Sequence, residues 1–179
     1  TAPLHIKDGG HDFSGLISTA RIDTLVAEQV FTGDQLSMAR SEPRLSEEAY
    51  LTDTGLADPG LVARRYQEGA TLILPQLHRR ERALADLCRA LEAELGHPVQ
   101  TNIYLTPPTA QGFQTHYDTH DVFILQVEGA KRWRLYDAPA GAVFRGEGFE
   151  PGAVKAGDIT AEFVLQPGEV AYVPRGLMH

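Results

Sequence analysis

The sequence has a single cysteine and no long hydrophobic run. Cys88 is the only cysteine among 179 residues, so an internal disulfide is impossible and a zinc site built from several thiolates is excluded. No apolar stretch approaches the roughly 18 residues needed to cross a bilayer, and the first residues lack the pattern of a signal peptide. We therefore expect a cytoplasmic protein with no membrane association, in which any metal ion is held by histidine and carboxylate side chains.

Basic residues are fewer than acidic residues. Sixteen Lys and Arg residues stand against 24 Asp and Glu residues, which gives a net charge of −8. Proteins that hold a nucleic-acid backbone usually present a broad basic surface, so no direct nucleic-acid binding is expected. A basic protein or peptide partner is permitted. The hydrophobic fraction of 42% is ordinary for a globular chain, and the length suits one domain with a helical extension.

The N-terminal part, residues 1–76, is mixed in character. Proline, aspartate and glycine punctuate it repeatedly, which is typical of irregular segments. We expect a wrapping region with short helices, one of them over Ile22–Val30. Ala70–Leu74 is a compact apolar run between Gly69 and Pro75, so it is interpreted as a strand associated with the following barrel.

Residues 77–97 are predicted to form an amphipathic helix. Leucines recur there at spacings of three and four residues with charged residues between them, and Gly96 is a typical C-terminal stop. Cys88 lies next to the leucine stripe and is interpreted as a small buried hydrophobic residue rather than a reactive thiol.

From residue 98 to residue 179 the hydrophobic pattern has a period of two. Several short runs rich in Val, Ile, Phe, Tyr and Trp are separated by turns that carry Pro and Gly, which predicts a sandwich or barrel core. Glu128–Ala130 and Gln166–Gly168 are each interpreted as tight hairpins. The fold class expected is therefore mainly β with helical N-terminal additions. The predicted strands are Val99–Leu105, Gly112–Asp118, Val122–Val127, Lys131–Tyr136, Glu162–Leu165 and Glu169–Val173.

One pair of side chains and one distant histidine suggest a metal site. His116 and Asp118 are two residues apart, and on a strand that spacing places both side chains on one face. An H-x-D tripeptide alone is weak evidence for a metal site, because it often arises by chance. Val173–His179 adds a strand that ends in a Pro/Gly turn and delivers a second histidine, His179. Two histidines and one carboxylate suit non-haem Fe(II), because three coordination positions stay open.

The other histidines have weaker claims. His120 is the main rival, since a perfectly regular strand would align it with the H-x-D pair, but a bulge or turn would aim it elsewhere. We expect that it is not a ligand. The four others lie in polar or turn contexts without ligand spacing and are most simply surface residues: His5, His11, His78 and His97.

Two segments together resemble a known family. Asn102–Tyr136 contains H-x-D-x-x-D-V-F and G-x-K-R-W-R, and Pro167–His179 ends in P-R-G-x-x-H; in combination these motifs resemble the cupin-type JmjC oxygenases of the ribosomal-oxygenase group. The resemblance implies a double-stranded β-helix, the cupin/JmjC jelly-roll barrel. The chain stops on His179 directly after a strand and turn, so we expect a barrel that is truncated after the third metal ligand.

The resemblance also implies roles for individual residues. His116, Asp118 and His179 would hold Fe(II), and Lys131 would bind the distal carboxylate of 2-oxoglutarate. Lys131, Trp133 and Leu135 alternate along their strand, so this row can point inward while Arg132 and Arg134 point outward.

Two further residues match family positions that line the cosubstrate pocket. They are Asn102 and Tyr104, which share one face of their strand. Asn102 could equally cap a strand end, and Tyr104 could be an ordinary core aromatic.

The implied activity is that of an Fe(II)- and 2-oxoglutarate-dependent dioxygenase that hydroxylates a protein side chain, Arg or His of a ribosomal protein. Bacterial arginine-directed members tend to have Arg where this chain has Lys131, so the choice between Arg and His stays open. A longer chain is expected to form a homodimer. The alternatives are a non-enzymatic or degenerate metal-binding cupin, a zinc-dependent hydrolase, and a lysine demethylase that uses the same chemistry.

Overall fold

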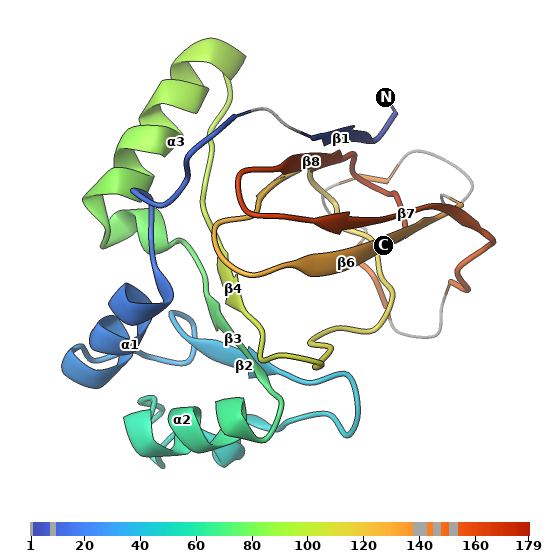
Figure 1. The fold of residues 1–179 in the computed structure, drawn as a ribbon. Helices are drawn as coiled ribbons and strands as arrows, with labels where there is room; N and C mark the ends of the chain where they lie inside the picture. Colours follow the sequence, from blue (N-terminus) through green and yellow to red (C-terminus); the bar gives the residue numbers. More distant parts are fainter. Residues whose placement is uncertain (1, 8–9, 138–142, 145–147, 151–153) are drawn as a thin grey trace. The chain divides into compact units, whose positions relative to one another are not determined.

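The structure is a computed structural model that describes residues 2–7, 10–137, 143–144, 148–150 and 154–179 (Figure 1). The chain divides into two compact units. One unit combines Thr1–Gly15 with Thr115–His179, and the other is Leu16–Gln114. Within the described part, no helix is long and apolar enough to cross a membrane.

The Leu16–Gln114 unit contains three α-helices, two short 3-10 helices and an antiparallel sheet with the strand order β2-β3-β4. The central strand, β3, carries the fully buried Leu74. The strand predicted from the apolar run Ala70–Leu74 is confirmed, and its association with the barrel stays a prediction. The elements are α1 (Thr19–Glu28), β2 (Ser37–Ala39), η1 (Glu47–Ala49), α2 (Pro59–Gln67), β3 (Thr71–Leu74), η2 (Leu77–Arg79), α3 (Arg82–Leu95) and β4 (Ile103–Leu105).

Helix α3 is shorter than the amphipathic pattern predicted. The preceding turn, η2, forms a separate 3-10 helix because Glu81 has an extended backbone, with φ −112° and ψ 118°, which interrupts the helix before Arg82. Along α3 the thiol of Cys88 is buried, as expected, and burial raises the pKa of that thiol. Gly96 ends the helix in the left-handed conformation with φ 67°, which glycine adopts without strain.

Helix α2 was not predicted. The Asp-Pro-Gly sequence that opens it was interpreted as irregular, although the same residues are good helix starters. The Asp58 side chain accepts a hydrogen bond from the Leu61 N–H at 2.9 Å, and Pro59 occupies the first turn, where its missing N–H costs nothing.

Among its described residues, the other unit has five strands in two sheets. One sheet has the order β1-β8-β5, and the second pairs β6 with β7; all of these pairings are antiparallel (Figure 1). Side chains of the two sheets meet, since the rings of His5 and Phe163 stack at 4.4 Å between centroids. The strands are β1 (Leu4–Ile6), β5 (Val122–Leu125), β6 (Lys131–Tyr136), β7 (Ile159–Leu165) and β8 (Val170–Val173).

The core of this unit lies between the two sheets. Leu135 of β6 and Leu165 of β7 are buried, as are Ala171 and Val173 of β8. In addition, the N–H of Tyr136 donates to the carbonyl of Met178 at 2.8 Å, which ties β6 to the last residues of the chain.

Three expectations about this unit were wrong. Gly112–Asp118 is not a strand, because only isolated backbone bonds hold it. Glu128–Ala130 does not form a hairpin either: β5 and β6 do not pair, since β5 lies beside β8 and β6 beside β7. The segment is a crossing between two sheets, with Gly129 at φ 64°. Gln166–Gly168 is a tight turn, in which the Glu169 N–H donates to the Gln166 carbonyl at 3.0 Å, but it is not the expected hairpin, because β7 pairs with β6 while β8 pairs with β1 and β5.

Candidate metal and cosubstrate site

His116 and His179 lie directly opposite each other. Each donates its backbone N–H to the carbonyl of the other, at 3.0 and 2.8 Å. His116 stands six residues before Val122 and His179 six residues after Val173, and these two valines are partners in the β5–β8 ladder. The pair therefore continues the register of that ladder across an irregular stretch. Opposed residues in an antiparallel pair project their side chains to the same face, and the two imidazole centroids are 4.7 Å apart.

Asp118 completes the cluster. Its carboxylate oxygen lies 3.8 Å from Nε2 of His179. Its backbone carbonyl accepts from the N–H of Gly176 at 2.9 Å, and Gly176, at φ 78°, is the third residue of the turn that leads to His179. One ligand atom from each of His116, Asp118 and His179 falls within 4.8 Å of the other two, so the three can share one ion.

The imidazole of His179 is oriented for ligation by a backbone contact. Its Nδ1 lies 3.0 Å from the carbonyl of Leu177, which can only accept, so Nδ1 carries the hydrogen and Nε2 is left with its lone pair. Burial lowers the pKa of His179, which favours the neutral form. A neutral imidazole with its other nitrogen hydrogen-bonded is the usual state of a metal-binding histidine.

The donor set constrains the metal. Two imidazoles and one carboxylate on one side of a site suit Fe(II) with open positions, and they also suit Zn(II). The thiol of Cys88 belongs to the other unit and is not among the clustered groups. His120 is exposed and does not join the cluster formed by the described residues.

Lys131 lies at the start of an alternating row on β6. Lys131, Trp133 and Leu135 are less exposed than Arg132 and Arg134, which matches the inward and outward rows predicted from the sequence. Burial lowers the pKa of Lys131, since a charged ammonium is less favourable away from water.

The outward row of β6 is held by ion pairs with β7. Glu162 of β7 accepts from Nε of Arg134 at 2.6 Å and lies 3.9 Å from the guanidinium of Arg132. The hydrogen bond from Arg134 lowers the pKa of Glu162. The two exposed arginines are thereby paired with an acidic side chain on the outer surface.

Trp133 is a site residue to which the sequence assigned no role. Its ring centroid lies 5.8 Å from that of His179. Its indole Nε1 is buried and has no hydrogen-bond partner among the described residues. The signal available in the sequence was its place between Lys131 and Leu135 on the inward row.

Asn102 and Tyr104 belong to the Leu16–Gln114 unit. The Asn102 side-chain oxygen accepts from the N–H of Gln76 at 3.1 Å, and Gln76 has a left-handed backbone with φ 51°. This is the capping role that the sequence left open. Tyr104 is 48% exposed and meets Phe113 edge-on at 5.9 Å, so it is not an ordinary core aromatic. Their contact with a cosubstrate stays a prediction.

His5 is not the surface residue expected from its sequence context. Its Nε2 lies 2.9 Å from a carboxylate oxygen of Glu169, and its ring stacks on Phe163. The short strand β1, which delivers His5, has only three residues and gave no periodic signal.

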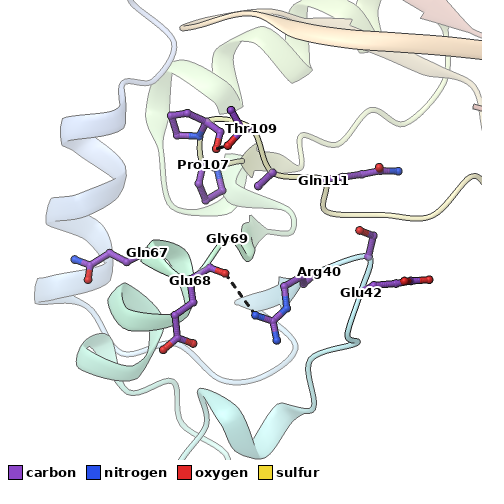
Figure 2. Close-up of a pocket in the computed structure, with 11 residues that line it drawn as sticks. Arg40, Glu42, Gln67, Glu68, Gly69, Pro107, Thr109 and Gln111 are labelled. Atoms are coloured by element: carbon purple, nitrogen blue, oxygen red, sulfur yellow. Dashed lines mark hydrogen bonds between the residues drawn. The ribbon is translucent and has the colours of Figure 1, made fainter.

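The Leu16–Gln114 unit also has an open pocket of about 390 Å³ (Figure 2). Arg40 and Glu68 lie on one side of it, and Pro107 and Gln111 are contributed by the segment after β4. Arg40 donates to the backbone carbonyl of Glu68 at 3.4 Å. None of the predicted metal or cosubstrate residues lines this pocket.

Comparison with known proteins identifies the family. The JmjC domain family matches residues 74–179, which is more than half of the chain. This chain belongs to that family. Escherichia coli ribosomal oxygenase YcfD has a similar structure, with a TM-score of 0.65 and 22% identity over 98% of this chain and 43% of that chain. The likeness confirms the cupin-type JmjC fold predicted from the motifs.

Curated relatives are closer in sequence. The bifunctional lysine-specific demethylase and histidyl-hydroxylase NO66 of Drosophila persimilis is 35% identical over 99% of this chain and 26% of its own length. Human ribosomal oxygenase 1 is 33% identical over 93% of this chain and 26% of its own length. The chain thus spans about a quarter of these relatives. A structure of YcfD with cobalt and 2-oxoglutarate also matches, with a TM-score of 0.63 and 20% identity over 99% of this chain and 43% of that chain.

Proposed function

We propose that this chain is the metal-binding part of an Fe(II)- and 2-oxoglutarate-dependent dioxygenase that hydroxylates a protein side chain. The observation that carries the proposal is the cluster of His116, Asp118 and His179, whose ligand atoms lie within 4.8 Å of one another. A half-buried lysine in the same unit supplies a cation for an acidic cosubstrate. A zinc hydrolase would have no use for that lysine.

Different side chains of this chain would bind the metal and the cosubstrate. The two imidazoles and the carboxylate would hold Fe(II) on one side, and bound iron with 2-oxoglutarate supplies the activation of O2 needed to oxidise a C–H bond. The Leu177 carbonyl keeps the His179 Nε2 available by accepting the Nδ1 hydrogen. Lys131 would pair with the distal carboxylate of 2-oxoglutarate, and burial there strengthens a charge-assisted contact.

The substrate class is proposed from the relatives. Their names specify ribosomal oxygenase, histidyl-hydroxylase and lysine-specific demethylase activities. The names support our proposal that the substrate is a ribosomal protein, and we propose Arg or His as the oxidised residue. Homodimerisation of a longer chain stays a separate proposal. A test is mass spectrometry of ribosomal proteins from cells with and without the gene. A 16 Da increase that disappears on deletion supports hydroxylation, whereas loss of methyl groups from lysine would indicate the demethylase alternative.

The metal assignment is tested by paired substitutions. Asp118→Ala removes the only anionic ligand and should abolish Mn(II) binding, measured by calorimetry with Mn(II) as the air-stable surrogate for Fe(II). His120→Ala is the matched control and should leave the Mn(II) affinity nearly unchanged. If His120→Ala removes the metal and His179→Ala does not, the ligand set is wrong. Tight zinc binding without any 2-oxoglutarate binding would favour the hydrolase instead.

A further inference from the structure

Trp133 is the only tryptophan in the chain. The indole Nε1 is buried and lacks a hydrogen-bond partner among the described residues. Buried indole N–H groups nearly always find an acceptor, because an unmade hydrogen bond costs free energy. A phenylalanine would occupy most of the same space without burying an unpaired N–H. The N–H therefore points to an acceptor that is not among the described residues, such as a bound ligand.

The position of Trp133 indicates which acceptor. It lies two residues from Lys131 on the inward row of β6. At the other end of the strand, the Tyr136 N–H donates to the carbonyl of Met178, the neighbour of His179, and the indole lies 5.8 Å from the His179 ring. Trp133 therefore lies on the inward row between Lys131 and the end of β6 that bonds beside His179, where a ligand joining the metal to the Lys131 ammonium would run alongside it.

We propose that the Trp133 N–H donates a hydrogen bond to an oxygen of the bound 2-oxo dicarboxylate and so fixes its position between the metal and Lys131. This inference rests on the proposed function. It assigns the row two different tasks: Lys131 supplies charge, and Trp133 supplies a neutral, directional donor. The next inward residue, Leu135, is apolar and fully buried, so the polar part of the row ends at Trp133.

The first test reads the indole directly. A protein with one tryptophan gives one indole signal in a ¹H–¹⁵N spectrum, so the signal needs no assignment. The protein is loaded with Zn(II), which is diamagnetic, and titrated with 2-oxoglutarate. The proposal expects the indole proton to move downfield as the hydrogen bond forms. Binding that is detected by calorimetry but leaves this signal in place overturns the proposal.

The second test uses substitutions and Mn(II)-loaded protein. Trp133→Phe keeps an aromatic ring and removes the donor, so 2-oxoglutarate affinity should fall roughly tenfold. Tyr172→Phe is the matched control: it removes an aromatic hydroxyl that donates to Asp121 at 2.6 Å, and 2-oxoglutarate affinity should not change.

The outcomes separate the two proposals. If the unsubstituted protein fails to bind 2-oxoglutarate, the proposed function is wrong. If it binds, and Lys131→Ala weakens binding while Trp133→Phe does not, only the donor role of Trp133 is overturned. Circular dichroism checks that Trp133→Phe is folded, and if it is not, the indole signal of the unsubstituted protein decides.

Discussion

Replacing Lys131 by Met should stabilise the protein without ligand and weaken its cosubstrate binding. The side chain lies on the inward row of β6, opposite the fully buried Leu165 of β7. Burial lowers its pKa because the charged form loses hydration, so the charge costs folding free energy. Methionine is of similar length and carries no charge. We expect a gain on the order of 1 kcal/mol, or about 2–4 °C in Tm for a chain of this size.

The effect on binding has the opposite sign. A charge-assisted contact with a carboxylate contributes about 1.5–3 kcal/mol, so Lys131→Met should weaken 2-oxoglutarate roughly ten- to hundredfold. Lys131→Arg keeps the charge and should lose less. Calorimetry with Mn(II)-loaded protein measures the affinity, and thermal melts of metal-free protein measure the stability.

The pH dependence gives an independent check. The folded chain releases the Lys131 proton at a lower pH than the unfolded chain, whose lysine titrates near its ordinary pKa of 10.5. Stability of the unsubstituted protein therefore rises with pH between the lowered pKa and 10.5. Methionine does not titrate, so the Tm advantage of Lys131→Met should be full below that window and vanish above it. A variant that melts lower at neutral pH and binds 2-oxoglutarate normally would refute this account.

Three further outcomes are expected. Gly176→Ala places a side chain at φ 78° and should lower stability by about 1–2 kcal/mol in urea melts, with weaker Mn(II) binding; an unchanged midpoint would contradict it. The hydrogen bond from His5 lowers the pKa of Glu169, so its stabilisation is present above pH 4.5 and lost as pH falls through the lowered value. Glu169→Gln should thus lower the urea midpoint at pH 6 but not in strong acid, and a constant difference would count against it. Asn102→Ala removes the acceptor for the Gln76 N–H and should cost about 1 kcal/mol of stability while leaving Mn(II) affinity intact, as melts and calorimetry would show.

The sequence predicted the elements whose pattern is local. The bounds of β6 agree with the predicted run Lys131–Tyr136, because six alternating residues between turns are a strong signal. The turn at Gln166–Gly168 was recognised because Pro followed by Gly suits its backbone, but the hairpin expected there was wrong, since β7 and β8 belong to different sheets. The start of α3 was missed by several residues, since Glu81 adopts an extended backbone that the leucine spacing does not reveal.

Strand pairing could not be predicted from local pattern. Nothing near Gly129 indicates that β5 pairs with β8 and β6 with β7 rather than with each other, because paired residues are 45–51 positions apart in the first ladder and 23–34 apart in the second. The same limit applies to the site. His116 and Asp118 were grouped by assuming a strand that does not form, and their side chains meet instead because the irregular segment bonds to the residues around His179.

Inward and outward side chains alternate along β6, so the chemistry of the site depends on the register of β6 against β7. If β6 slipped by one residue against β7, Lys131 and Trp133 would turn to solvent, and Arg132 and Arg134 would be driven into the interior. The ion pairs of those arginines with Glu162 oppose that slip from the outer surface. Ion pairs on the outer surface of this strand can therefore protect cosubstrate recognition on its inner face, and a single-residue insertion or deletion within the strand would be more damaging than most substitutions in it.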